Sequence, residues 1–428
     1  MLWQPSLPER YIKMKPDEAA RLISDRRARL GESLVILGHH YQTDEIIRHA
    51  DYTGDSLKLS QLAAKVATER PVKWVIFCGV HFMAETADML TPEHVDVILP
   101  DLSAGCSMAD MAAYEDAVDA WDTLHKTLNQ RHAAAGGKGE WRGRIIPITY
   151  VNSTAAVKAF VGSNGGACCT SSNAKQVFDW AMAGGTIPAS PDEEIKVLFL
   201  PDQHLGRNTA AAYGLDVTTE TCLYDPRVVR RGDPLGGSTA DQIARARVIL
   251  WAGHCSVHKL FRPEHCDEIR KANQSLAPGQ EPMKILVHPE CAKEVVDKSD
   301  LAGSTEFIIK TIRAARPGSR WAIGTEVHLV ARLVKEAAQR GVEARILSDC
   351  QCLCTTMFRI DQPHLLWVLD NLCGYPTRDG QPEGQPESRP TGEPKVVNAV
   401  RVHPEVSAAA LLAVDRMLSL STPVAKAD

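Results

Sequence analysis

Three cysteines occupy matching positions in three similar segments of the chain. Cys106, Cys255 and Cys354 close the segments VDVILPDLSAGC, ARVILWAGHC and ARILSDCQCLC. Each segment contains a short, apolar, β-branched run that predicts a buried parallel strand. Loops that follow the carboxyl ends of such strands carry the ligands in open α/β sheets. Thiolates from three separate loops therefore indicate one shared metal centre, and three ligands leave a coordination position open for a substrate.

The identity of the metal and of the third ligand is open at this point. Structural zinc sites usually have paired Cys-x-x-Cys knuckles, whereas these three cysteines lie far apart in the sequence. An iron–sulfur cluster held by three cysteines leaves one iron available as a Lewis acid for the loss of a hydroxyl group. Cys350 and Cys352 are close enough to Cys354 to replace it as a ligand or to form a redox-sensitive pair with it.

Polar side chains come directly after the first predicted strand of each segment. We expect the loops that carry them to be partly open, so that these side chains line a site rather than the core. Imidazole and carboxylate groups transfer protons near neutral pH when their pKa values are tuned, and tyrosine and asparagine can orient a bound carbonyl. His258, in the loop of Cys255, is a candidate proton donor or positioning group. The strand-end candidates are His39, Tyr41, Tyr150, Asn152, His288 and Glu290.

A hydroxyl residue precedes a helical pattern in each segment. These residues are Ser56, Ser171, and Ser304 with Thr305. Each alone is explained as a helix N-cap, whose oxygen satisfies a free backbone donor. Three helix N-termini directed at one centre would instead bind anions, because they combine free N–H groups with the positive end of the helix dipole. Both interpretations stay open, and the second predicts substrates that carry carboxylates and a phosphate.

These markers recur at similar intervals, which indicates a threefold internal repeat. Within each copy, strand-like runs alternate with helical runs, and this predicts a small, parallel, Rossmann-like α/β domain. A further histidine recurs in the copies, and helix capping or packing explains it equally well: His81, His204 and His328. The predicted domains are 1–112 with an N-terminal helix, 113–258 with insertions, 259–374, and 375–428 as a Pro/Gly-rich linker and a helix that docks back on the body. The insertion at 113–144 is expected to be a solvated surface excursion.

Composition restricts the class of protein. The 428 residues contain 44% hydrophobic and 24% charged residues, as in ordinary globular domains. The net charge of −5 gives no basic footprint for nucleic acid. Because the N-terminus lacks a secretory pattern and no apolar run approaches the ~20 residues of a membrane span, we expect a cytoplasmic protein. In that reducing compartment, the 12 cysteines indicate metal or redox chemistry rather than disulfides. Those inside apolar runs, Cys78, Cys168 and Cys169, are expected to be buried.

The motifs taken together resemble the quinolinate synthase family, the iron–sulfur enzymes of NAD biosynthesis. The resemblance runs from about 34 to 354, and the tail VNAVRVHPEVSAAALLAVDRML is also similar to the end of the family. The motifs are GHHYQ, DYTGDSLKL, TYVNSTAAVKA, CCTSSNA, PDQHLGRN, WAGHCSVH, ILVHPEC and GSTEFI. The resemblance implies three repeated α/β domains around a central cavity, and a condensation of iminoaspartate with dihydroxyacetone phosphate to quinolinate with loss of phosphate and water.

The resemblance also implies roles for single residues. A 4Fe–4S cluster with one open iron would be held by Cys106, Cys255 and Cys354, the last by the register of the segment that follows it. Ser56, Ser171, Ser304 and Thr305 would contact the carboxylates and the phosphate, while His39, Tyr150 and Asn152 would line the cavity. Proton transfer and orientation would fall to Tyr41, His258, His288 and Glu290. An enzyme that supplies iminoaspartate would be a partner.

Two alternatives belong to other classes. A diphthamide-synthesis type enzyme also resembles three domains that each give one cysteine to a cluster, but the His-Pro-Glu and Tyr-Val-Asn motifs favour small substrates. A non-catalytic zinc or redox-sensing protein could be built on Cys350, Cys352 and Cys354, but it leaves Cys106 and Cys255 unexplained.

Overall fold

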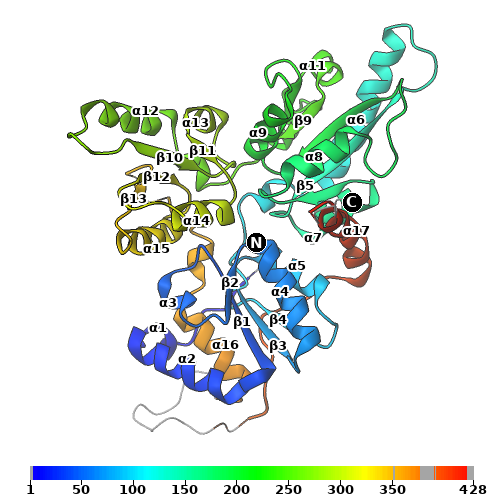
Figure 1. Cartoon of the computed structure of the whole chain (residues 1–428). Helices are drawn as coiled ribbons and strands as arrows, with labels where there is room; N and C mark the ends of the chain where they lie inside the picture. Colours follow the sequence, from blue (N-terminus) through cyan, green and yellow to red (C-terminus); the bar gives the residue numbers. More distant parts are fainter. Residues whose placement is uncertain (1–2, 350–351, 376–389, 391, 422–428) are drawn as a thin grey trace, which may run out of the picture. The chain divides into compact units, whose positions relative to one another are not determined.

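Two units make up the computed structural model, which describes residues 3–349, 352–375, 390 and 392–421 (Figure 1). Unit 1 comprises Met1–Cys106 and Leu353–Val402, and unit 2 comprises Ser107–Cys352 and His403–Asp428. Unit 1 contains one sheet, and unit 2 contains two. Cys350 and most of the predicted linker lie outside the described residues.

The three sheets share one strand order. In each sheet the first strand of the copy lies between the second and the third, and the fourth strand flanks the third. All these pairings are parallel. The matched strands are β1 (Leu34–His39), β2 (Tyr52–Gly54), β3 (Trp74–Cys78) and β4 (Asp96–Ile98) in unit 1; β5 (Gly143–Tyr150), β6 (Ala167–Cys169), β7 (Glu194–Leu200) and β9 (Val248–Trp251) in the first sheet of unit 2; and β10 (Met283–Val287), β11 (Leu301–Ala302), β12 (Arg320–Gly324) and β13 (Glu343–Ile346) in the second. The predicted α/β fold of three repeated parallel sheets is confirmed.

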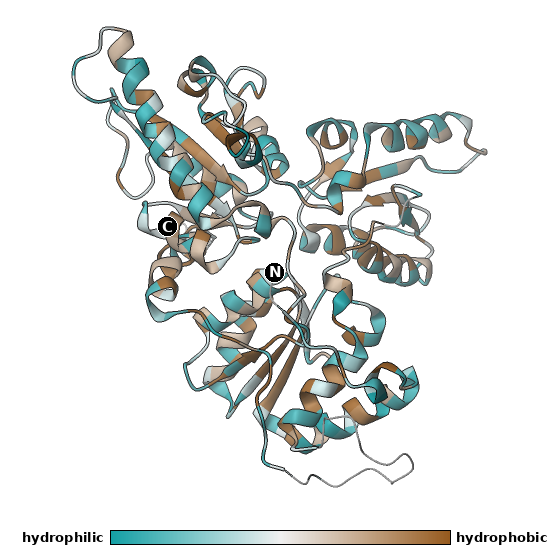
Figure 2. Ribbon diagram, turned by 180° about the vertical axis from the view of Figure 1, so that it is seen from behind, coloured by the Kyte–Doolittle hydropathy of each residue, from teal (hydrophilic) through white to brown (hydrophobic). Residues whose placement is uncertain are grey.

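The first strand of each copy is apolar because helices cover both faces of its sheet. All six residues of β1 are buried, and the strands are largely hydrophobic in Figure 2, whereas the helices mix hydrophobic and hydrophilic residues. Such two-sided burial explains why these strands read as continuous apolar runs rather than as alternating ones. Cys78, Cys168 and Cys169 lie in these strands and are buried, as predicted.

In unit 1, helices from both ends of the described chain cover the sheet. Figure 1 shows α4 and α5 on one side, and α2 with α16 on the other. A short antiparallel strand, β14 (Ala399–Val400), pairs with β4 at the edge. The helices of this unit are α1 (Glu9–Ile12), α2 (Pro16–Leu30), α3 (Asp44–Ile47), α4 (Ser56–Glu69), α5 (His81–Leu90) and α16 (Gln362–Leu372).

In unit 2, the first sheet has an additional edge strand, and the C-terminal helix packs against it. β8 (Thr221–Tyr224) pairs in parallel with β9, and α17 (Pro404–Ser421) packs on α7 and β6, which confirms the predicted docking of the tail helix. A Cβ atom at Gly162 of α7 would lie 2.1 Å from the carbonyl oxygen of Ala409, so only glycine permits this close approach. The other helices are α6 (Tyr114–Ala134), α7 (Ala155–Ser163), α8 (Ala174–Met182), α9 (Gln203–Tyr213), α10 (Pro226–Val229), α11 (Ala240–Arg245), α12 (Pro263–Ala272), α13 (Lys293–Lys298), α14 (Thr305–Arg313) and α15 (Val327–Ala338).

The expectation of a solvated excursion at 113–144 is wrong for most of that segment. α6 has 21 residues and packs against α11 and α7, with Ala117, Ala120 and Leu124 buried. Apolar residues at helical spacing form that buried face, and the Gly-rich appearance of the segment's end hid it. α6 precedes the first strand of its sheet just as α2 and α12 precede theirs, so it belongs to the repeat.

A buried ion pair joins the two ends of unit 1. Asp370 of α16 accepts hydrogen bonds from Arg26 Nε and from Tyr11 Oη, both at 2.8 Å. The side chains of Arg26 and Asp370 are only 7% and 8% exposed. Removing one partner of such a pair leaves an uncompensated buried charge, which destabilises strongly.

We expect Asp370→Ala to lower the free energy of unfolding by about 3–5 kcal/mol, measured by urea denaturation of the full chain. Asp25→Ala is the matched control, because Asp25 forms an exposed pair with Arg21 at 3.2 Å and should cost less than about 1 kcal/mol. Equal losses in the two variants would contradict a structural role for the buried pair.

Among the helices that the structure describes, none is long and apolar enough to cross a membrane.

Candidate functional site

The same local structure follows each predicted ligand cysteine. Cys106, Cys255 and Cys354 lie after the fourth strand of their copies, and a single 3₁₀ turn begins at the same interval after each. The next α-helix, α6, α12 or α16, again begins at a shared interval. The turns are η2 (Ala109–Met111), η3 (His258–Leu260) and η5 (Met357–Arg359). Three sequences with few identical residues thus present a cysteine in the same way.

Exposure separates these three cysteines from the others. Of the cysteines that the structure describes, Cys106, Cys255 and Cys354 are partly exposed, and every other one is buried. Cys352 is fully buried, with its sulfur 3.8 Å from Ser348 Oγ. A thiol must reach an external ion to bind it, so this difference favours Cys354 over Cys352 as the third ligand.

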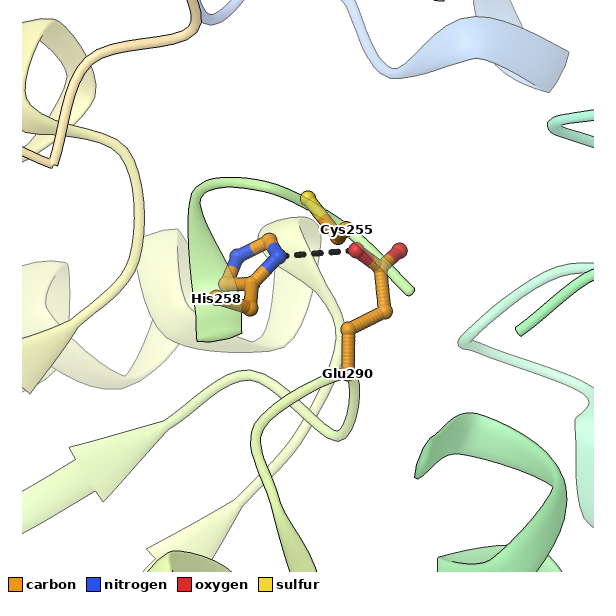
Figure 3. A group of neighbouring side chains, drawn as sticks. All are labelled: Cys255, His258 and Glu290. Carbon is orange, nitrogen blue, oxygen red and sulfur yellow. Dashed lines mark hydrogen bonds and ion pairs between the residues drawn. The ribbon is translucent and has the colours of Figure 1, made fainter. Parts of the chain in front are cut away.

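In unit 2, side chains from two loops and one strand end meet next to Cys255, and Figure 3 shows His258 and Glu290 among them. His258 Nδ1 lies 2.7 Å from Glu290 Oε2, and the imidazoles of His258 and His288 stack with their centroids 4.4 Å apart. Tyr150, the last residue of β5, also donates a hydrogen bond to Glu290. Candidates from loops far apart in the sequence are therefore brought together by the strand ends of two sheets.

The predicted openness of these loops is wrong for most of the candidates. His39, Tyr150, His258, His288 and Glu290 are each at most 5% exposed. Burial is tolerated because these polar groups hydrogen-bond to one another or to the backbone. Tyr41 and Asn152 are partly exposed.

This burial has opposite consequences for His288 and Glu290. Burial, together with the positive charge of His258, lowers the pKa of His288 to about 3, so His288 is neutral at physiological pH. Burial alone would raise the pKa of Glu290, but the electrostatic interaction with His258, that with His288, and the hydrogen bonds from His258 and Tyr150 outweigh it and lower that pKa. Glu290 is therefore a carboxylate beside a neutral imidazole.

The backbone sets the tautomer of two histidines. The amide of Glu290 donates to His288 Nδ1 at 3.3 Å, and the amide of Tyr41 donates to His39 Nδ1 at 3.1 Å in the first copy. A neutral imidazole that accepts at Nδ1 carries its proton on Nε2. Neutral His288 therefore carries its proton on Nε2, and the same backbone contact orients the ring of His39 in the first copy.

The N-cap interpretation holds for one of the three serines. Ser304 Oγ accepts from Phe307 N at 3.3 Å and caps α14, which begins at Thr305. α4 is capped instead by Asp55, whose carboxylate accepts from Lys58 N, and Ser56 is its first helical residue. Ser171 lies in the turn before α8, whose N-cap residue is Asn173. The hydroxyl groups of Ser56 and Ser171 are thus not used as caps in this structure.

The recurrent histidines do not cap their helices, whose N-cap residues are Val80, Asp202 and Glu326. His81 begins α5, while His204 and His328 lie in the first turns of α9 and α15. The acidic residues Asp202 and Glu326 cap those two helices.

Three residues that support the site were missed in the sequence. Asp202 Oδ2 accepts from Cys255 N at 3.1 Å. Asn208 Nδ2 donates to the carbonyls of Pro289 and Cys291, at 2.8 and 2.9 Å, and so holds both sides of Glu290. Thr325 Oγ1 lies 3.1 Å from His258 Nε2. Asp202 could have been found, because it precedes a helical run in PDQHLGRN. Asn208 and Thr325 could not, because their roles depend on contacts between copies.

Comparisons with known proteins identify the family of the chain. The family model described as quinolinate synthetase A protein (NadA) matches residues 23–419. A quinolinate synthase from Acidobacterium capsulatum is 45% identical over 96% of this chain and 95% of its own length. One from a Nocardioides species is 48% identical over 92% of this chain and 87% of its own length. The chain belongs to the quinolinate synthase family.

Membership in the quinolinate synthase family makes the chain an enzyme with small-molecule substrates. The diphthamide-type and non-catalytic alternatives receive no support from the comparisons. Relatives such as the quinolinate synthase of Rhodopirellula baltica, 44% identical over 96% of this chain, match nearly the whole sequence, including the segments that carry the candidate residues.

Proposed function

We propose that the chain condenses iminoaspartate with dihydroxyacetone phosphate to quinolinate, with loss of phosphate and water, as a step of NAD biosynthesis. The observation that carries this proposal is the buried group of Glu290, His258, His288 and Tyr150 beside Cys255, in a chain of the quinolinate synthase family. A partner enzyme that supplies iminoaspartate belongs to the proposal, because imines hydrolyse readily in water. We place the reaction in the cytoplasm.

The donor set fits an iron–sulfur cluster. Cys106, Cys255 and Cys354 share one backbone motif and are partly exposed, and thiolates are the ligands that such clusters prefer. We assign these three residues as ligands of a 4Fe–4S cluster. When bound, a cluster with only three cysteine ligands supplies Lewis-acid chemistry for the loss of a hydroxyl group.

Helix N-termini are assigned to the anionic groups of the substrates. α14 begins at Thr305 and has Ser304 as its N-cap; both residues are buried, and a helix N-terminus presents the positive end of the helix dipole. α4 begins at Ser56, and Ser171 precedes α8. Because the hydroxyls of Ser56 and Ser171 do not cap their helices, they are available to bind carboxylate or phosphate oxygens together with the helix N–H groups.

We assign proton transfer to Glu290 together with His258 and His288. The carboxylate of Glu290 and Nδ1 of His258 are close enough to hold one proton between them, and to receive it from or return it to a substrate atom. Neutral His288 offers Nε2–H to a substrate oxygen. Tyr41 and His39, with rings 4.8 Å apart, and Asn152 are assigned to orienting the substrates.

The test is an anaerobic assay for quinolinate with the two proposed substrates and iron-loaded chain. Quinolinate should form only when both substrates and iron-loaded chain are present, and the metal-free chain is the control. Failure of a fully loaded chain to form quinolinate would overturn the proposal.

A further inference from the structure

We propose that Cys255, His258 and Glu290 form a mononuclear Zn²⁺ site in chains that carry no iron–sulfur cluster, and that zinc and the cluster exclude each other. One ligand atom from each residue lies within 4.8 Å of the other two (Figure 3). Cys255 and His258 come from one loop with Cys-x-x-His spacing, and Glu290 comes from the loop after β10. The whole site lies inside unit 2.

The three ligand atoms, which lie within 4.8 Å of one another, need only small shifts to hold a small tetrahedral ion. Zinc bonds of 2.0–2.3 Å place neighbouring ligand atoms about 3–4 Å apart. The contact of 2.7 Å between His258 Nδ1 and Glu290 Oε2 needs to open by about 0.5–1 Å, and zinc then replaces the proton between them. Here two ligands come from one loop and the third comes from another. Catalytic zinc sites likewise have three protein ligands and leave the fourth position open.

The groups that would hold the three ligands in place are already present. Metal-bound histidines almost always donate the other ring N–H to a partner, and Thr325 Oγ1 lies 3.1 Å from His258 Nε2. Tyr150 hydrogen-bonds to Glu290. Asp202 accepts from the amide of Cys255. These supporting hydrogen bonds are a separate observation from the closeness of the three ligand atoms. Metal sites in proteins have such hydrogen bonds to their ligands.

Charge and donor type select the metal. A thiolate and a carboxylate balance a divalent ion, and His258 and Glu290 are almost completely buried, so the ion compensates a buried negative charge. Sulfur and nitrogen donors disfavour Mg²⁺ and Ca²⁺, which take oxygen ligands. Among available ions, Zn²⁺ binds such sites more tightly than Fe²⁺. Iron-depleted chains would therefore collect zinc at this place.

The exclusion rests on the proposed function, because it requires that Cys255 is also a cluster ligand. One sulfur cannot hold a buried zinc ion and a cluster iron in the assigned arrangement. Zinc bound first should then prevent cluster assembly.

The site is tested by titrating the full-length, cluster-free chain with Co²⁺, followed by displacement with Zn²⁺. We expect a thiolate-to-cobalt charge-transfer band that saturates near one ion per chain. Cys255→Ser, His258→Gln and Glu290→Gln should abolish it, and Thr325→Val should weaken binding about 10–100-fold. Matched controls next to the ligands, His254→Gln and Cys291→Ser, and Cys106→Ser from the first copy, should leave it intact.

A band that survives in both His258→Gln and Glu290→Gln would overturn the zinc site, and would leave the quinolinate assay untouched. The exclusion is tested by reconstituting the cluster with and without prior zinc. Loss of cluster assembly in the wild-type chain, but not in His258→Gln, supports it. Full cluster assembly with the zinc retained would overturn both the exclusion and the assignment of Cys255 to the cluster.

Discussion

Glu290→Gln should lower turnover about 10²–10⁴-fold while leaving the iron and sulfide content unchanged. The substitution keeps the size of the side chain and its hydrogen bond from Tyr150, but it removes the negative charge that faces His258 at 2.7 Å. An amide at position 290 cannot accept a proton, so the group loses its carboxylate base. The measurement is kcat for quinolinate formation, with metal analysis of the same preparation.

Glu294→Gln is the matched control for this variant. Glu294 follows Glu290 in the same segment, in the first turn of α13, and is exposed. Its substitution should leave kcat within about twofold, as is usual for surface changes. Unchanged turnover in Glu290→Gln would remove this carboxylate from catalysis and leave it a structural role.

Alanine at Cys106, Cys255 or Cys354 should each cause loss of the cluster. A cluster held by three thiolates has no spare protein ligand, so one substitution leaves a second iron without a ligand from the protein. Iron and sulfide contents should fall to a small fraction of the wild-type values after anaerobic reconstitution, and the charge-transfer absorption should disappear with them.

Cys291→Ala is the control, because Cys291 is buried beside Glu290 with its sulfur 3.9 Å from the carbonyl oxygen of Gly324. Burial and the charge of Glu290 raise the pKa of this thiol well above its usual value, so it is a poor ligand. A full cluster in Cys255→Ala would refute the ligand assignment, and a full cluster in Cys354→Ala would move the third ligand to another thiol.

The fold could be predicted from the sequence because the repeat produces local patterns of residues. Apolar runs of strand length, helical spacing between them and matched cysteines recur in three copies, and a shared strand order follows from them. The exception was α6, whose Gly-rich end resembled a loop although its apolar face is helical. Pattern reasoning is weakest where a helix is longer in one copy than in the others.

The site was predicted only in part. The identities of Glu290 and His258 could be read from motifs, but their mutual contact joins loops of two copies and depends on how the sheets pack. Burial of the group could not be predicted either, because each residue alone is polar and follows a strand. It becomes tolerable only when the partners, including Thr325 and Asn208, are all in place.

The pairing of α16 with the N-terminal helices has a consequence for synthesis on the ribosome. Tyr11 and Arg26 meet Asp370 across sequence separations of 359 and 344 residues. α1 and α2 therefore cannot complete their packing until α16 has been translated. The sheets of unit 2 consist of segments made before α16, and only α17 joins them later. During synthesis, α1 and α2 stay without their partner over these 344 to 359 residues, so their apolar faces need protection from premature association.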